Sequence, residues 1–112
     1  MFEVTEVSIA ELRAALEAGR TTAVELVEAY LARIDAYDGA DTTTQLNAVV
    51  VRNPDALKEA EASDARRARG EPLSPLDGIP YTAKDSYLVK GLTAASGSPA
   101  FKDLVAQRDA FT

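Results

Sequence analysis

The sequence of 112 residues contains no cysteine and no histidine. Without cysteine, disulfide bonds and thiolate metal sites are excluded, and cysteine usage says nothing about the redox compartment. Without histidine, the commonest metal ligand and the commonest general base are both missing. Any acid–base chemistry therefore falls to carboxylates, lysine or tyrosine, and we expect neither a metal nor a cofactor.

Positive charge and long apolar runs are also scarce. Twelve Lys and Arg residues against eighteen Asp and Glu residues give a formal net charge of −6. This charge argues against nucleic acid and against an anionic membrane surface, because Lys and Arg bind both. No run approaches the ~20 apolar residues of a membrane span. The acidic residues 1–12 lack the basic start and apolar block of a signal peptide, so we expect a cytoplasmic protein.

The first third of the chain, residues 1–39, is predicted to be helical. Ser8 and Glu11 form a capping-box pattern, and Thr22 and Glu25 repeat it. Apolar residues spaced three and four apart follow each box, and a glycine ends each stripe. The linker between the two helices is short, so we expect them to pack as neighbours.

The middle of the chain, residues 46–70, is predicted to form a strand and then a helix. The β-branched run at residues 46–51 is typical of a strand covered on both faces. Asn53 and Pro54 are typical of a helix start. Near the end of this helix stand Arg66, Arg67 and Arg69, which we interpret as a solvated helix end rather than a phosphate-binding patch.

Residues 71–112 change to loop composition around one further strand, residues 79–87, which carries Lys84. Two strands separated by a helix predict a right-handed parallel β-α-β unit. The expected fold class is therefore α/β, with N-terminal helices followed by the start of a mixed or parallel sheet. No further strand is predicted after Gly91, and a fresh helix start is predicted near Asp109.

Two strands are too few for a buried sheet, because sheets average about five to six strands. We therefore expect residues 1–112 to be the N-terminal part of a single larger domain. Such a part would associate with the remainder of the fold, or with itself as a homo-oligomer, because an incomplete sheet exposes unpaired edges.

Lys84 is the candidate catalytic residue. A lysine in a half-buried strand must be desolvated, and a lysine that acts as a base must be neutral near pH 7, which burial favours. On a strand, Thr82, Lys84 and Ser86 share one face. The alternative is a lysine whose ammonium group reaches solvent or pairs with Asp85.

The segment around Lys84 resembles the N-terminal part of the amidase signature family. The resemblance is carried by Gly78-Ile79-Pro80, by Lys84-Asp85 shortly after it, and by Gly97-Ser98 beyond a short loop. The upstream helices and the Leu46-Asn47-Ala48 run fit the same family. Asp77 stands where members often have histidine, and Ser86 where they often have asparagine.

This resemblance implies a serine hydrolase that acts on an amide substrate. In the family, a nucleophilic serine is activated through a second serine, held by a cis peptide, which passes its proton to a lysine. That lysine corresponds to Lys84. Both serines, and backbone donors for the oxyanion, belong to a Gly/Ser-rich segment that the family carries downstream of residues 1–112. The resemblance therefore implies that this chain supplies only the base and is inactive alone.

Other interpretations of the sequence stay open. The chain could be a non-catalytic module that binds a partner or self-associates, or part of the ammonia-producing subunit of a transfer-RNA amidotransferase, which shares the signature. We expect Ser86, Ser96 and Ser98 not to replace the missing serines, because no oxyanion hole accompanies them and serine in turns usually bonds its own backbone. Asp85 is expected to order a loop or pair with a cation. Tyr81 and Tyr87 are expected to be core or rim aromatics.

Overall fold

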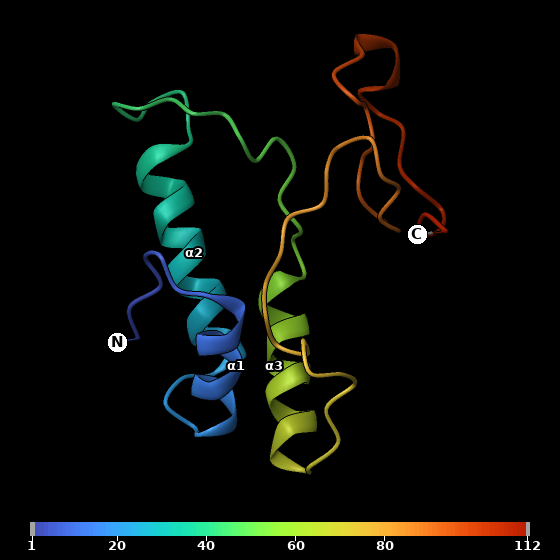
Figure 1. Cartoon of the computed structure of the whole chain (residues 1–112). Coiled ribbons are helices and arrows are strands. Elements are labelled where there is room, and N and C mark those ends of the chain that lie inside the picture. Colours follow the sequence, from blue (N-terminus) through green and yellow to red (C-terminus); the bar gives the residue numbers. More distant parts are fainter. Residues whose placement is uncertain (1, 112) are drawn as a thin grey trace. The chain divides into compact units, whose positions relative to one another are not determined.

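The structure, a computed structural model, describes residues 2–111 and divides into two compact units (Figure 1). The first unit contains residues 2–47 and 54–80, and the second contains residues 48–53 and 81–111. None of the helices in residues 2–111 is both long and apolar enough to cross a lipid bilayer. The helices are α1 (Ile9–Glu17), α2 (Ala23–Tyr37), α3 (Ala56–Ala68) and the short 3₁₀ helix η1 (Pro99–Phe101).

Helices α1 and α2 begin at the two predicted capping boxes. The Ser8 hydroxyl accepts the amide of Glu11 at 3.2 Å, and the Glu11 carboxylate accepts the amide of Ser8 at 2.8 Å. The equivalent distances for Thr22 and Glu25 are 3.1 and 3.2 Å. Bonds to Ser8 also lower the pKa of the Glu11 carboxyl. Local side-chain chemistry thus fixes both helix starts, as predicted.

The N-terminus of α2 has a second cap, a side chain of α3. The Asp64 carboxylate accepts the amides of Ala23 and Val24 at 2.8 and 3.1 Å. Together with the Thr22 hydroxyl, which accepts the amide of Glu25, this carboxylate satisfies the first orphan donors of α2. A negative charge at a helix N-terminus is also favoured by the helix dipole. Helices α2 and α3 pack against each other, as Figure 1 shows.

The core of the first unit is small and apolar. Leu12 and Leu16 of α1 pack with Leu26 of α2, which confirms that these helices are neighbours. Residues from both ends of the unit cover this cluster, among them Ile79 of the predicted signature segment. The Gly-Ile-Pro segment therefore contacts the core of the helical unit through Ile79.

Helix α3 begins two residues later than predicted and ends where predicted. Its N-cap is Asp55, so Asn53 and Pro54 precede the helix. At its end, Gly70 has a φ of +73° and donates its amide to the Arg67 carbonyl at 2.9 Å. The left-handed conformation that closes the helix favours glycine at this position.

The predicted strands are wrong for this chain. Residues 2–111 contain no β-strand, so neither residues 46–51 nor residues 79–87 form one, and no parallel β-α-β unit is present. A strand needs a neighbour with which to exchange backbone hydrogen bonds. Around Lys84 the backbone instead makes a turn, in which the amide of Tyr87 donates to the Lys84 carbonyl at 2.8 Å.

The start of the first predicted strand turns back onto α2. Gln45 and Asn47 both have a φ of +48°, in the left-handed region that interrupts an extended chain. The amides of Leu46 and Asn47 donate to the carbonyls of Tyr37 and Asp38, at 3.2 and 2.8 Å. These bonds satisfy carbonyls at the end of α2, and asparagine is among the residues that tolerate this conformation.

In the second unit, two segments run antiparallel to each other, although the sequence predicts no pairing there. Residues 88–94 and 104–110 exchange backbone hydrogen bonds of 2.8–3.0 Å, with an isolated bridge between Thr93 and Val105. Asp109 does not start a helix in the described residues, and its carboxylate instead accepts the amide of Lys90 at 2.8 Å. Neither segment has a clear alternation of apolar and polar residues, so no sequence pattern marks this ribbon.

Candidate active-site lysine and the loop that leads to it

Asp77 lies at the end of the proline-rich loop that follows α3, and its side chain is only 6% exposed. Its carboxylate accepts two hydrogen bonds from the Arg66 guanidinium, at 2.8 and 2.9 Å. It also accepts the Ser63 hydroxyl at 2.7 Å and the amide of Leu73 at 2.9 Å. The Arg67 guanidinium donates to the Asp77 carbonyl. Asp77 thus anchors the loop to α3.

The surroundings of Asp77 keep it ionised. The hydrogen bonds from Arg66, assisted by those from Leu73 and Ser63, hold the pKa of the Asp77 carboxyl far below its usual range, although burial acts in the opposite direction. The same pair raises the pKa of Arg66. A carboxylate that is ionised at neutral pH only accepts hydrogen bonds, so it is suited to holding structure and unsuited to donating a proton.

The bonds of Arg66 and Arg67 to Asp77 correct our interpretation of the three arginines as a solvated helix end. The side chain of Arg66 is 25% exposed and that of Arg67 is half-buried, so neither belongs to a solvated helix end. Arg69 does, because its side chain is 58% exposed and pairs with Glu71 at the surface. The spacing of Ser63 and Arg66, three residues apart on one helix face, was the signal that sequence reasoning missed.

Gly78 passes through the point at which all three helices meet. Its φ is +93°, and a Cβ atom there would lie 3.0 Å from Ser63 Oγ of α3, 3.3 Å from Ala23 Cβ of α2 and 3.5 Å from Leu16 Cδ1 of α1. Only glycine combines this backbone conformation with such close contacts. The Gly-Ile-Pro pattern therefore has a structural cause in this chain: glycine at the helix junction and Ile79 in the core.

We predict that Gly78→Ala destabilises the chain more than Gly70→Ala. Both glycines have positive φ, but nothing lies within 4 Å of a Cβ at Gly70. Left-handed strain costs about 1–2 kcal/mol at either position, and overpacking adds about 1–3 kcal/mol at Gly78. Urea denaturation followed by circular dichroism measures both losses. Equal losses would show that the contacts around Gly78 relax at no cost.

Lys84 follows this anchored segment and is exposed. Its ammonium group has no hydrogen-bond or ion-pair partner among residues 2–111, so it pairs with neither Asp85 nor Ser86. It lines an open hollow of about 480 Å³ together with Tyr81, Tyr87 and Asp109. The expected burial of Lys84 is therefore absent within the described residues, and the structure presents an accessible amine at the edge of a hollow.

The three serines considered as substitutes are not brought to Lys84. Ser86 is exposed in the turn next to it, and Ser96, with a φ of +49°, lies in the loop before η1. Ser98 precedes Pro99 at the start of η1, and its side chain makes no capping bond. Tyr81 and Tyr87, 85% and 49% exposed, are rim rather than core residues.

Two proteins with similar sequences are subunits of glutamyl-tRNA(Gln) amidotransferases. The chain is 43% identical over 106 residues to a glutamyl-tRNA(Gln) amidotransferase subunit of Thioalkalivibrio sulfidiphilus, a match that covers 94% of this chain and 21% of that protein. It is 43% identical over 99 residues to the corresponding protein of Thermobifida fusca, a match that covers 88% of this chain and 19% of that protein. The chain thus spans about a fifth of the length of these relatives.

Two similar solved structures are those of amidases. The native peptide amidase of Stenotrophomonas maltophilia matches 98% of this chain and 22% of its own, with a TM-score of 0.90 and 38% identity. An amidase family protein of Bacillus anthracis matches 96% of this chain and 21% of its own, with a TM-score of 0.83 and 31% identity. The model of the Amidase family matches residues 25–112. The chain therefore belongs to the amidase signature family.

Proposed function

We propose that this chain is the base-bearing part of an amide hydrolase, in which Lys84 accepts the proton of a serine pair supplied by the rest of the protein. The observation that carries the proposal is an accessible, unpartnered lysine directly after a segment anchored in the core of an amidase-family chain. A neutral amine is the group that an activated serine nucleophile requires as its base.

The proposed reaction balances through Lys84. The nucleophilic serine attacks the amide carbonyl while its proton moves through the second serine to the Lys84 amine. Lys84, now an ammonium group, returns that proton to the leaving nitrogen, and ammonia or an amine departs. Water then attacks the acyl-serine while Lys84 accepts its proton. Lys84 returns that proton through the second serine to the departing serine oxygen, and the acid product leaves.

The proposal requires that the remainder of the protein cover the hollow at Lys84. A lysine becomes a base near neutral pH only when it is removed from water. The second unit exposes large apolar side chains that favour such a cover: Tyr81, Tyr87, Phe101, Leu104 and Val105 are 44–85% exposed. Apolar surface of this kind is typical of a face that binds another part of a protein.

A chimaera tests the proposal. Residues 2–111 replace the matching segment of the Stenotrophomonas maltophilia peptide amidase, and ammonia release from a peptide amide is measured. We expect the chimaera to hydrolyse the amide and the purified 112-residue chain to release no ammonia. A folded but inactive chimaera, or amide cleavage by the chain alone, would refute the proposal.

A second candidate is the ammonia-producing subunit of a transfer-RNA amidotransferase, favoured by the names of both sequence relatives. The role of Lys84 is the same in both candidates, and the acceptor of the nitrogen differs. To test this candidate, residues 2–111 replace the matching segment of the Thioalkalivibrio sulfidiphilus protein, and amide transfer to glutamyl-tRNA(Gln) is measured. Activity in only one of the two chimaeras would assign the chain to that candidate.

A further inference from the structure

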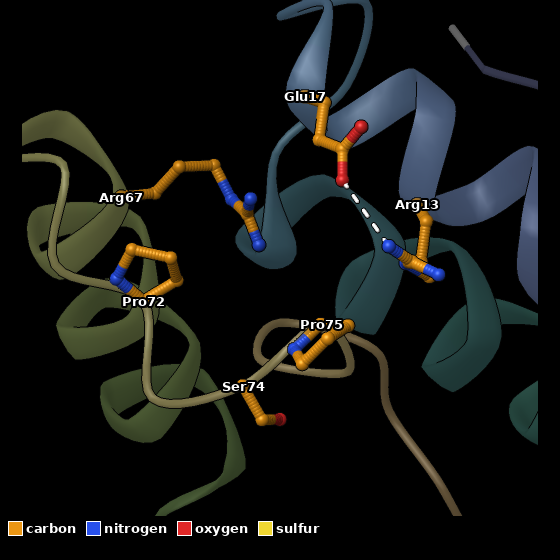
Figure 2. A pocket seen from close by; sticks show the side chains of 6 residues that line it. All are labelled: Arg13, Glu17, Arg67, Pro72, Ser74 and Pro75. Carbon is orange, nitrogen blue, oxygen red and sulfur yellow. Dashed lines mark ion pairs between the residues drawn. The ribbon is translucent and has the colours of Figure 1, made fainter.

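A second hollow, of about 360 Å³, lies within the first unit, and none of the residues that line it is assigned to catalysis. Figure 2 shows its walls: Arg13 and Glu17 extend from α1, Arg67 extends from α3, and the loop after α3 contributes Pro72, Ser74 and Pro75. The volume is at the lower end of the range of small-molecule sites. The prolines give the loop side of this hollow a rigid apolar wall.

Two guanidinium groups in the hollow have hydrogen-bond capacity that the described residues leave unused. The Nε atoms of Arg13 and Arg67 are buried, and neither has a hydrogen-bond partner within residues 2–111. A buried donor without an acceptor carries a desolvation penalty that an incoming acceptor relieves. The other end of the Arg67 guanidinium donates to the Asp77 carbonyl, so this guanidinium is held in place at the hollow.

The charge in the hollow is unbalanced. Glu17 faces Arg13 with 3.6 Å between carboxylate and guanidinium, too long for a hydrogen bond, and its side chain is 62% exposed. Arg67 has no carboxylate partner of its own, whereas its neighbour Arg66 is paired with Asp77. Water can satisfy a donor but cannot neutralise the second arginine, whereas an anion does both.

We propose that this hollow binds a small oxyanion, a phosphate or carboxylate group held between the guanidinium groups of Arg13 and Arg67. Arginine is the residue whose planar fork matches such groups. The exposed Glu17 lies at the same hollow and opposes an anion by charge repulsion. The inference does not depend on the proposed amidase activity, because none of these residues takes part in the reaction proposed for Lys84.

The test is a titration followed on the arginine Nε–H signals of the ¹⁵N-labelled chain. Inorganic phosphate and acetate are added separately at constant ionic strength, with chloride as the reference salt. We expect saturable shifts of the Nε–H signals of Arg13 and Arg67, and no saturable shift for Arg69, which faces solvent. Saturation by phosphate alone, or by acetate alone, identifies which oxyanion the hollow accepts.

Variants test the proposal because they are expected to change the affinity for the oxyanion in opposite directions. Arg13→Gln and Arg67→Gln are each expected to weaken binding at least about tenfold, because each removes a charge-assisted hydrogen bond. Glu17→Gln is expected to tighten it about threefold, because it removes a repulsive charge. Arg69→Gln is the matched control and is expected to leave affinity unchanged.

The wild-type titration decides the proposal even if a variant fails to fold. Shifts that do not saturate, or that are equal for all arginines, overturn it, as does an affinity that Glu17→Gln leaves unchanged or weakens. Poor amide dispersion would show that the isolated chain is unfolded. In that case phosphate and acetate are added to the Stenotrophomonas maltophilia chimaera instead, and the change in its Tm is measured. If phosphate or acetate raises the Tm of the chimaera equally with and without Arg13→Gln, the proposal is overturned.

Discussion

Lys84→Met is expected to lower kcat of the Stenotrophomonas maltophilia chimaera at least about a hundredfold, with KM little changed. Methionine keeps an unbranched side chain of similar size but removes the amine that accepts the serine proton. Because Lys84 has no partner among residues 2–111, the change breaks no hydrogen bond or ion pair described in the chain. Steady-state ammonia release with purified enzyme gives both constants.

Lys102→Met is the matched control. Lys102 is 73% exposed and pairs only with the adjacent Asp103 at the surface, so its removal is expected to leave kcat within about twofold. Equal losses for the two variants would show a general effect of removing lysine from the second unit. A Lys84→Met chimaera that retains full kcat would remove Lys84 from the mechanism.

Asp77→Asn is expected to destabilise the chain by about 2–4 kcal/mol at pH 7, because it leaves the partly buried Arg66 without its counter-charge. Asparagine has the same shape, so the loss reports charge and hydrogen bonding rather than volume. Glu71→Gln is the control: it breaks the exposed pair with Arg69, and we expect a change within about 1 kcal/mol. Urea denaturation at pH 7 gives both values.

The same pair predicts how stability depends on pH. The pKa of the Asp77 carboxyl is lower in the folded chain than its unfolded value of about 3.9, so the unfolded state binds the proton first as the pH falls. The contribution of Asp77 is therefore complete above about pH 5 and is lost progressively as the pH falls below about 4. The stability difference between wild type and Asp77→Asn should shrink between about pH 5 and pH 3. A difference that is constant over this range would contradict the proposed charge effect.

The helices could be predicted from the sequence because their causes are local. The boxes at Ser8 and Thr22 act over three residues, and Gly70 ends α3 through its own backbone conformation. Lys84-Asp85 and the Gly-Ile-Pro segment are equally short-range patterns. Family membership follows from these motifs, and the comparisons confirm it.

What could not be predicted depends on residues far apart in the sequence. The contacts of Asp77 with Ser63 and Arg66 join a loop to a helix face, and no local pattern marks Asp77 as buried. The expectation of strands failed for a related reason. Composition shows that residues 46–51 are apolar and β-branched, but a strand forms only where a neighbour is present, and positive φ at Gln45 and Asn47 turns the chain away.

Asp64 of α3 accepts the amides of Ala23 and Val24, and this contact has a consequence for the order of folding. During synthesis from the N-terminus, α2 emerges about forty residues before Asp64 does, since the bonds span 40 and 41 positions. Until then the first turn of α2 has only its own capping box, Thr22 with Glu25, and the amides of Ala23 and Val24 bond to water. We therefore expect the start of α2 to gain its second cap only after α3 has left the ribosome.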